Sequence, residues 1–273
     1  MSVCRSPKAE WSLMNRLISG GFADIHSHVL YGMDDGAKTR NDSLRMLEMA
    51  AASGTTDLVA TPHANSRYRY DPAVIDAQIA DLNASVEGIR VHRGCDFHLQ
   101  MDNIQDAVAN PEKYSINGCG YLMVEFPDTF MYQNVGSILN HLMEAGLIPV
   151  ITHPERNSFL RVRHADLVEW VNSGCYLQVT AGSITGHFGK TAQRSAQALL
   201  RRGVVHIIAS DGHDCVHRPP SLAAAYEAMA QEYGEHAIRP LFVDHPHAII
   251  AGDTLDVAVR PMKSSRSWYQ FWV

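Results

Sequence analysis

The stretch ADIHSHVLYGMDDGAKT, residues 23–39, concentrates side chains that can bind a metal ion. His26 and His28 lie two residues apart, so in extended backbone their imidazoles project to the same side and can converge on one ion. Asp34 and Asp35 follow within a few residues. This spacing indicates one part of a metal site, and the chain contains 15 histidines from which further ligands could come.

Further ionisable residues follow other apolar runs of the sequence, each near the point where a strand would end. They are His63 in ATPHA, Asp96 in RGCDF, Glu125 in VEFP, His153 in THPER, and Asp211 with His213 in ASDGH. Burying so many ionisable groups together without a cation would be costly. One zinc ion uses three or four ligands, so this larger set predicts two or three metal ions. Nitrogen and oxygen ligands without thiolate suit manganese, iron or zinc.

A repeated order of elements would bring these residues together. Apolar runs rich in β-forming residues alternate with helical patterns, and they occur at 22–26, 56–61, 89–94, 121–126, 148–152, 175–180 and 204–210. Strand, helix and strand in repetition predict parallel strands with crossover helices, and about seven of them favour a closed barrel over an open sheet. In such a barrel the chemistry collects at the carboxyl ends of the strands.

Helix boundaries are marked by capping residues and glycines. Thr39 and Asp42 approximate a capping box for a helix over 39–53, and Asp71 followed by Pro72 is typical of the start of the next helix. Three later helical patterns are followed by a glycine, which suits the left-handed position after a helix, and then by a strand. These glycines are Gly146, Gly174 and Gly203.

The length of 273 residues suits a single barrel domain, which we expect at 22–253 between an N-terminal extension, 1–21, and a basic, aromatic C-terminal tail, 254–273. The tail could bind a partner or a membrane surface, or pack on its own domain. The net charge of −6 argues against a nucleic-acid partner. Five cysteines without a C-x-x-C pair favour the reducing cytoplasm. No apolar run is long enough for an integral membrane protein.

Two arginines and two further histidines stand close to the candidate ligands. Arg156 and Arg218 could be ordinary surface residues, but guanidinium forks beside bound cations are suited to gripping phosphate oxygens. Phosphate-ester hydrolysis is therefore the chemistry that the sequence favours. His98 and His217 lie next to site residues, and each could contact a ligand residue or the substrate.

The motifs DIHSHVLYGMDDGAKT, ATPH, GCDFHL, VEFP, THPER and SDGHDCVHRPP resemble those of the PHP (polymerase and histidinol phosphatase) superfamily. Their details are most similar to its bacterial metal-dependent tyrosine phosphatases of the CpsB/CapC type. The resemblance implies a distorted TIM-like (β/α)7 barrel that holds three ions, commonly manganese. Carried over by position, the ligand sets would be His26, His28, Asp96 and Asp211; then Asp96 as a bridge, Glu125 and His153; then Asp35, His63 and His213. Asp96 departs from the glutamate that is frequent in the family.

The resemblance also implies a mechanism and a substrate. A metal-bridging hydroxide would attack phosphorus, with Arg156 and Arg218 on the phosphate and Asp211 and His213 completing the catalytic set. The substrate would be a phosphotyrosine residue of a bacterial tyrosine autokinase. By removing this phosphate, the enzyme would regulate capsule or exopolysaccharide synthesis. A cysteine-based tyrosine phosphatase is excluded, because no cysteine has an arginine six residues later.

Two other functions fit the same residues. The barrel could hydrolyse a small alkyl phosphate such as histidinol phosphate, or a phosphate at a nucleic-acid end. It could also be an inactive scaffold, although that interpretation predicts missing ligands. The sequence does not indicate the general acid or the oligomeric state.

Overall fold

The computed structural model describes residues 20–128, 133–255, 257 and 261–262. The elements are, in chain order, β1 (Phe22–Ser27), α2 (Arg40–Ala52), β2 (Thr55–Ala60), β3 (His63–Ala64), α3 (Pro72–Asn83), β4 (Arg90–Arg93), β5 (Asp96–His98), α4 (Met101–Ala109), α5 (Pro111–Tyr114), η1 (Ile116–Gly118), β6 (Tyr121–Glu125), α6 (Val135–Glu144), β7 (Ile148–Thr152), η2 (Leu160–Val162), α7 (His164–Asn172), β8 (Tyr176–Thr180), α8 (Ala181–Thr185), α9 (Gly189–Arg202), β9 (Ile207–Ala209), α10 (Ala223–Tyr233), α11 (Glu235–Arg239), η3 (Pro240–Asp244) and α12 (His245–Ala251).

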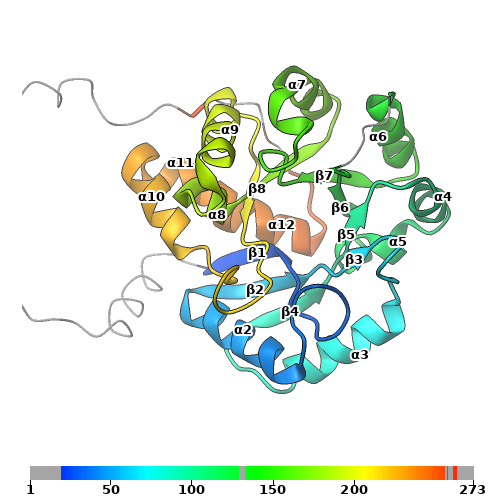
Figure 1. The fold of residues 1–273 in the computed structure, drawn as a ribbon, viewed down its shortest axis with the longest axis vertical. Helices are drawn as coiled ribbons and strands as arrows, with labels where there is room; N and C mark the ends of the chain where they lie inside the picture. The colour runs from blue at the N-terminus through cyan, green and yellow to red at the C-terminus, as the bar shows by residue number, and fades with distance from the viewer. Residues whose placement is uncertain (1–19, 129–132, 256, 258–260, 263–273) are drawn as a thin grey trace, which may run out of the picture.

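The strands form a parallel barrel with seven positions. β2 continues into β3 and β4 into β5 across short breaks, so the two sheets, β1-β2-β4 and β3-β5-β6-β7-β8-β9, share two of their strand positions. Backbone bonds from Asp211 N to His26 O and from His28 N to Gly212 O, both 2.8 Å, join β1 to the segment after β9. The predicted (β/α)7 barrel is therefore confirmed, with helices around its outside (Figure 1).

The break between β4 and β5 has a steric cause. Gly94 donates its N–H to Ala60 O at 2.9 Å, which brings these two segments of backbone close together. A Cβ at Gly94 would lie 2.5 Å from the Val59 side chain, so only glycine allows this approach. The shift at this point places Asp96 at the start of β5, opposite His63 of β3.

The predicted helix caps are confirmed. Thr39 Oγ1 accepts a hydrogen bond from Asp42 N at 3.2 Å, and Asp42 accepts one from Thr39 N at 3.0 Å, which completes the capping box of α2. The Asp71 carboxylate accepts from Ala73 N at the start of α3, where Pro72 occupies the first turn. Gly203 ends α9 in the left-handed conformation, with φ of 73°.

Apolar side chains fill two separate regions. The larger lies between the strands and the surrounding helices, and the smaller lies inside the barrel towards the amino ends of the strands. Ile25, Met123, Val150 and Ile207 of four strands form the smaller cluster with residues of α12. Figure 1 shows α12 beside β1, so this C-terminal helix closes that end of the barrel. The strand, helix and glycine pattern of the sequence gives no indication of this closure.

The two ends of the chain lie mostly outside the described residues. The expected extension 1–21 and tail 254–273 fall mostly outside the described residues, so that division stays a prediction. None of the helices in the described ranges has the length and apolar character that crossing a bilayer requires.

Candidate metal centre

The carboxyl ends of the strands bring the nine predicted ligands into one cluster. His26 comes from β1, His63 from β3, Asp96 from β5 and Glu125 from β6. The others stand on the loops that follow β1, β7 and β9, and they are His28, Asp35, His153, Asp211 and His213. Overlapping groups of potential ligand atoms within 4.8 Å of one another connect all nine of these residues.

The first predicted ligand set meets around the Asp211 carboxylate. His28 Nε2 lies 3.4 Å and His26 Nε2 3.5 Å from Asp211 Oδ1. Asp96 Oδ2 lies 3.6 Å from His26 Nε2 on the other side. All four side chains are almost completely buried. The ligand atoms of His26, His28 and Asp211 are thus spaced so that one cation could lie between them, while Asp96 reaches this group through His26.

The second predicted set is divided between two groups that share Asp96, one with His63, His98 and Glu125 and the other with His26 and His153. His153 Nε2 lies 3.7 Å from Glu125 Oε1, and His63 Nδ1 lies 3.0 Å from Asp96 Oδ2. His98 Nε2 contacts Glu125 Oε2 and belongs to the same group of potential ligands. A signal for His98 was present in the sequence, because it stands two residues after Asp96, the same spacing that relates His26 to His28.

The third set lies at the rim of the cluster. Asp35 Oδ1 is 3.3 Å from His63 Nε2 and 3.5 Å from His213 Nε2. About half of the Asp35 side chain is exposed, whereas both histidines are largely buried. His63 therefore lies between the second and third sets. By contrast, His217 is exposed and is not brought to the cluster by a side-chain contact among the described residues.

The chemistry of the cluster fits divalent cations. Both oxygens of the fully buried Asp96 lack a hydrogen-bond partner among the described residues, although His26 and His63 are near. A buried carboxylate without a partner is costly, and a cation at this point would compensate it. The donors are imidazole nitrogens and carboxylate oxygens, as manganese, iron or zinc require.

The electrostatics agree with this fit. Burial favours the neutral form of Asp96, but His26 and His63 hold the pKa of its carboxyl well below its usual range. Burial likewise opposes protonation of His28, yet Asp34 and Asp211 raise its pKa to about 9. The carboxylates thus create a negative potential that attracts either protons or metal ions, and metal binding would displace the protons.

Neighbouring polar residues orient the ligands. Asp34, which the sequence places beside the ligands, lies 2.7 Å from His28 Nδ1 through Oδ2 and also accepts a bond from Gly36 N at 2.9 Å. Gln178 Oε1 lies 3.1 Å from His26 Nδ1. Such contacts to the second ring nitrogen fix which nitrogen faces the metal. The sequence gives no signal for Gln178, because its strand end carries no ionisable residue.

The backbone at the cluster is unusual. His153 and Asp211 adopt positive φ angles of 32° and 54°, which are rare for residues other than glycine. A Cβ at Gly36 would lie 2.0 Å from the backbone oxygen of His28. Any larger residue at Gly36 would therefore displace His28, a candidate ligand just after β1.

The two predicted phosphate-binding arginines meet at this cluster. Arg156 Nη1 and Arg218 Nη2 both donate to Asp211 Oδ2. Both guanidinium groups also lie over the Phe188 ring, 4.2 Å and 5.9 Å from its centroid. Buried Glu155 joins the Arg156 turn to α8, because its Oε1 accepts bonds from Thr180 N at 3.0 Å and Ser183 Oγ at 2.7 Å. Nothing in the local sequence indicated the role of Phe188.

Known proteins are similar to this chain in sequence. The chain is 34% identical over 202 residues to "Putative tyrosine-protein phosphatase CapC" of Staphylococcus aureus, covering 72% of this chain and 78% of the relative. It is 33% identical over 216 residues to "Tyrosine-protein phosphatase YwqE" of Bacillus subtilis, covering 77% and 85%.

Solved structures agree with these relatives. One described under "Crystal structures of YwqE from Bacillus subtilis and CpsB from Streptococcus pneumoniae, unique metal-dependent tyrosine phosphatases" superposes with a TM-score of 0.81 at 28% identity, covering 90% of this chain and all of the other. A β-aspartyl dipeptidase from Fervidobacterium islandicum shares the fold alone, with a TM-score of 0.55 at 14% identity, covering 86% and 75%. The family model described as "Capsular polysaccharide synthesis, CpsB/CapC" matches residues 22–251, so this chain belongs to the CpsB/CapC family.

Proposed function

We propose that this chain is a metal-dependent protein-tyrosine phosphatase. The observation that carries the proposal is the meeting of nine nitrogen and oxygen ligands with two arginines at one mouth of the barrel. The family relationship supports it, because relatives with this fold are named tyrosine-protein phosphatases. An inactive scaffold is disfavoured, because it predicts missing ligands and all nine candidate residues belong to groups that could hold a metal ion.

The cluster would hold two or three divalent ions, and manganese is our first choice. The ligand sets are those set out above, with His98 as an additional candidate beside Glu125. When bound, such ions lower the pKa of water and polarise phosphoryl oxygens, which is the chemistry needed to attack a phosphate ester. Asp34 and Gln178 would keep His28 and His26 in the orientation that binding requires.

The arginines would bind and orient the phosphate. Their guanidinium groups already converge on Asp211 Oδ2, which shows that both can reach one anionic oxygen at the cluster. Phosphate oxygens match the guanidinium fork as carboxylate oxygens do. Phe188 keeps both forks on the same side, because each lies over its ring. The leaving phenolate, with an ordinary pKa of about 10, needs less protonation than an alkoxide.

The substrate, partner and location follow as parts of the same proposal. The substrate would be phosphotyrosine in a protein, and we propose a bacterial tyrosine autokinase that controls capsule or exopolysaccharide synthesis, in keeping with the family description. A cytoplasmic location is supported by the free thiols of the four described cysteines, Cys95, Cys119, Cys175 and Cys215.

Hydrolysis of a phosphotyrosine peptide by the purified protein tests the proposal. We expect activity that is lost with EDTA and restored by manganese. Arg156→Gln should raise KM for the peptide without loss of bound metal, whereas Arg90→Gln, at the amino end of β4, should change neither. Activity that survives EDTA, or faster turnover of histidinol phosphate than of phosphotyrosine, would contradict the proposal.

A further inference from the structure

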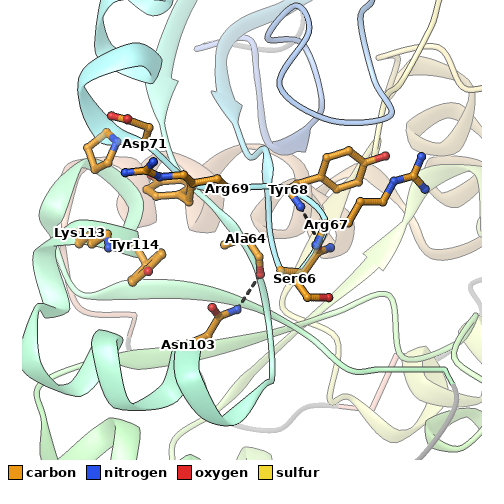
Figure 2. Close-up of a pocket in the computed structure, with 12 residues that line it drawn as sticks. Ala64, Ser66, Arg67, Tyr68, Arg69, Asp71, Asn103, Lys113 and Tyr114 are labelled. Carbon is orange, nitrogen blue, oxygen red and sulfur yellow. Dashed lines mark hydrogen bonds between the residues drawn. The ribbon is translucent and has the colours of Figure 1, made fainter.

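A cavity of about 420 Å³ lies directly beside the metal centre. Its wall is the segment 64–72, which connects β3 to α3, and its floor includes Asn103 of α4 and Tyr114 of α5 (Figure 2). We call this cavity the 64–72 groove. The function proposed above uses none of the side chains that line it.

The groove is continuous with the candidate ligands. The Tyr68 ring stacks on the imidazole of His63, with centroids 5.9 Å apart and planes inclined by 17°. Asn103 Nδ2 donates to Ala64 O at 2.7 Å and to His98 O at 3.0 Å. A chain leaving the metal centre on this side would therefore cross Tyr68 and enter the groove.

Two arginines of the groove are available to a ligand. Arg67 and Arg69 are exposed and form no ion pair with any described residue, although Arg67 lies over the Tyr68 ring at 5.0 Å. Figure 2 shows Arg69 extending towards the side of Lys113 and Tyr114, and Arg67 extending the other way. The one carboxylate of the lining, Asp71, already caps α3. A net positive lining in a chain of net charge −6 favours an anionic ligand.

The segment is held in place before any ligand binds. Asn65 Oδ1 accepts hydrogen bonds from Arg67 N and Tyr68 N, both at 2.9 Å. The Tyr70 hydroxyl donates to Gly94 O at 3.0 Å, and its ring packs on Tyr114 with centroids 5.1 Å apart. A groove ordered in this way loses little conformational entropy when it binds a chain.

Another part of the mouth has a different charge. A second cavity there is lined by Asp35, Asp42 and Asp214 together with Lys38 and Arg45. The three carboxylates offset the charges of Lys38 and Arg45, so this cavity does not favour an acidic peptide. These two cavities therefore differ in charge, and of the two the 64–72 groove is the positive one.

We propose that the 64–72 groove binds acidic side chains that flank the phosphotyrosine of the protein substrate. This inference rests on the proposed function, because it assumes that a phosphotyrosine peptide enters the mouth. Arg67 and Arg69 supply the charge, and Tyr68 guides the peptide from the metal centre to them. The groove thus determines specificity and takes no part in the phosphate chemistry.

Steady-state kinetics on matched substrates test this inference. The manganese-loaded protein is assayed on a phosphotyrosine peptide with glutamates on either side, on the same peptide with glutamines, and on p-nitrophenyl phosphate. We expect a preference in kcat/KM of about three- to tenfold for the acidic peptide, the size that two exposed ion pairs supply, and a decline with salt.

Variants separate the groove from the chemistry. Arg67→Gln/Arg69→Gln should raise KM for the acidic peptide by about three- to tenfold and leave p-nitrophenyl phosphate turnover unchanged. Arg67→Lys/Arg69→Lys should retain most of the preference. A control of equal charge, Arg90→Gln/Arg201→Gln, alters exposed residues near the amino ends of β4 and β9 and should retain it fully.

The outcomes distinguish the two proposals. Hydrolysis of the acidic and neutral peptides with equal kcat/KM would overturn the groove alone. A preference that survives Arg67→Gln/Arg69→Gln would also overturn it, since the preference would then arise elsewhere. Absence of manganese-dependent hydrolysis of either peptide would overturn the proposed function, and the inference about the groove with it.

Discussion

The two ends of the barrel interior are built from the same strands and have opposite chemistry. Towards the amino ends, Ile25, Met123, Val150 and Ile207 pack on one another, and α12 closes the barrel. Towards the carboxyl ends, the same strands, or the loops that follow them, carry the ligand cluster. At the apolar end the side chains are fully packed against one another. The cluster, by contrast, retains buried carboxylate oxygens that lack a hydrogen-bond partner among the described residues.

This difference separates stability from function. Close packing at the apolar end contributes to the free energy of folding, because it removes apolar surface from water. The cluster opposes folding unless cations compensate its buried charges. Substitutions at the two ends should therefore have opposite signatures, and the following predictions test this, beginning with the largest expected effect.

Asp96→Asn should nearly abolish catalysis. The substitution keeps the size of the side chain and removes a buried charge that two ligand sets would share. Loss of several kcal/mol of charge stabilisation corresponds to a fall in kcat of about a thousandfold. We expect reduced metal content, measured by elemental analysis, and a smaller rise in Tm on adding manganese than the wild type shows.

The matched control is Asp57→Asn in β2. Asp57 is partly exposed and lies 2.8 Å from His92 Nε2, near the amino ends of the strands. The Asp57→Asn variant should retain wild-type kcat and metal content. An Asp96→Asn variant with full metal content and unchanged kcat would show that Asp96 is not a ligand.

Met123→Ala should produce the converse result. Met123 is fully buried at the apolar end, and truncating such a side chain typically lowers the free energy of unfolding by about 2–5 kcal/mol. Urea denaturation measures this change, and kcat below the transition should stay at the wild-type value. Met101→Ala, at an exposed methionine, should change stability by no more than about 0.5 kcal/mol. A large fall in kcat for Met123→Ala would mean that the two ends are coupled.

Short-range features of the barrel could be predicted from the sequence. The capping box at Thr39 and the left-handed glycine at Gly203 depend on neighbours within a few residues, so local spacing indicates them. The convergence of the nine ligands could be predicted as well, because the carboxyl ends of parallel strands meet at one mouth.

Features that depend on distant contacts could not be predicted. The contact of Phe188 with Arg156 and Arg218 requires the relative placement of three separate loops. The closure of the barrel by α12 requires packing against strands more than a hundred residues earlier. Gln178 has no charge to mark it, and only its distance from His26 identifies its role.

His206 offers the smallest effect and the sharpest contrast with the cluster. It lies just before β9 and is almost completely buried, and its Nδ1 accepts a hydrogen bond from Leu177 N at 3.1 Å. Burial, with His245 nearby, lowers its pKa from 6.5 to about 3. The cluster histidine His28 responds in the opposite direction, because carboxylates surround it.

The sign of the effect follows from proton linkage. Between about pH 6.5 and pH 3 the unfolded chain binds a proton at residue 206 and the folded chain does not, so stability falls as the pH falls through this window. At pH 5 the loss from this group is about 2 kcal/mol. His206→Asn keeps an acceptor and cannot titrate, so its free energy of unfolding, measured by urea denaturation with excess manganese, should decline less between pH 7 and pH 5. An equal decrease in the free energy of unfolding for both proteins would show that burial does not keep His206 neutral. The packing at the apolar end would then not exclude charge.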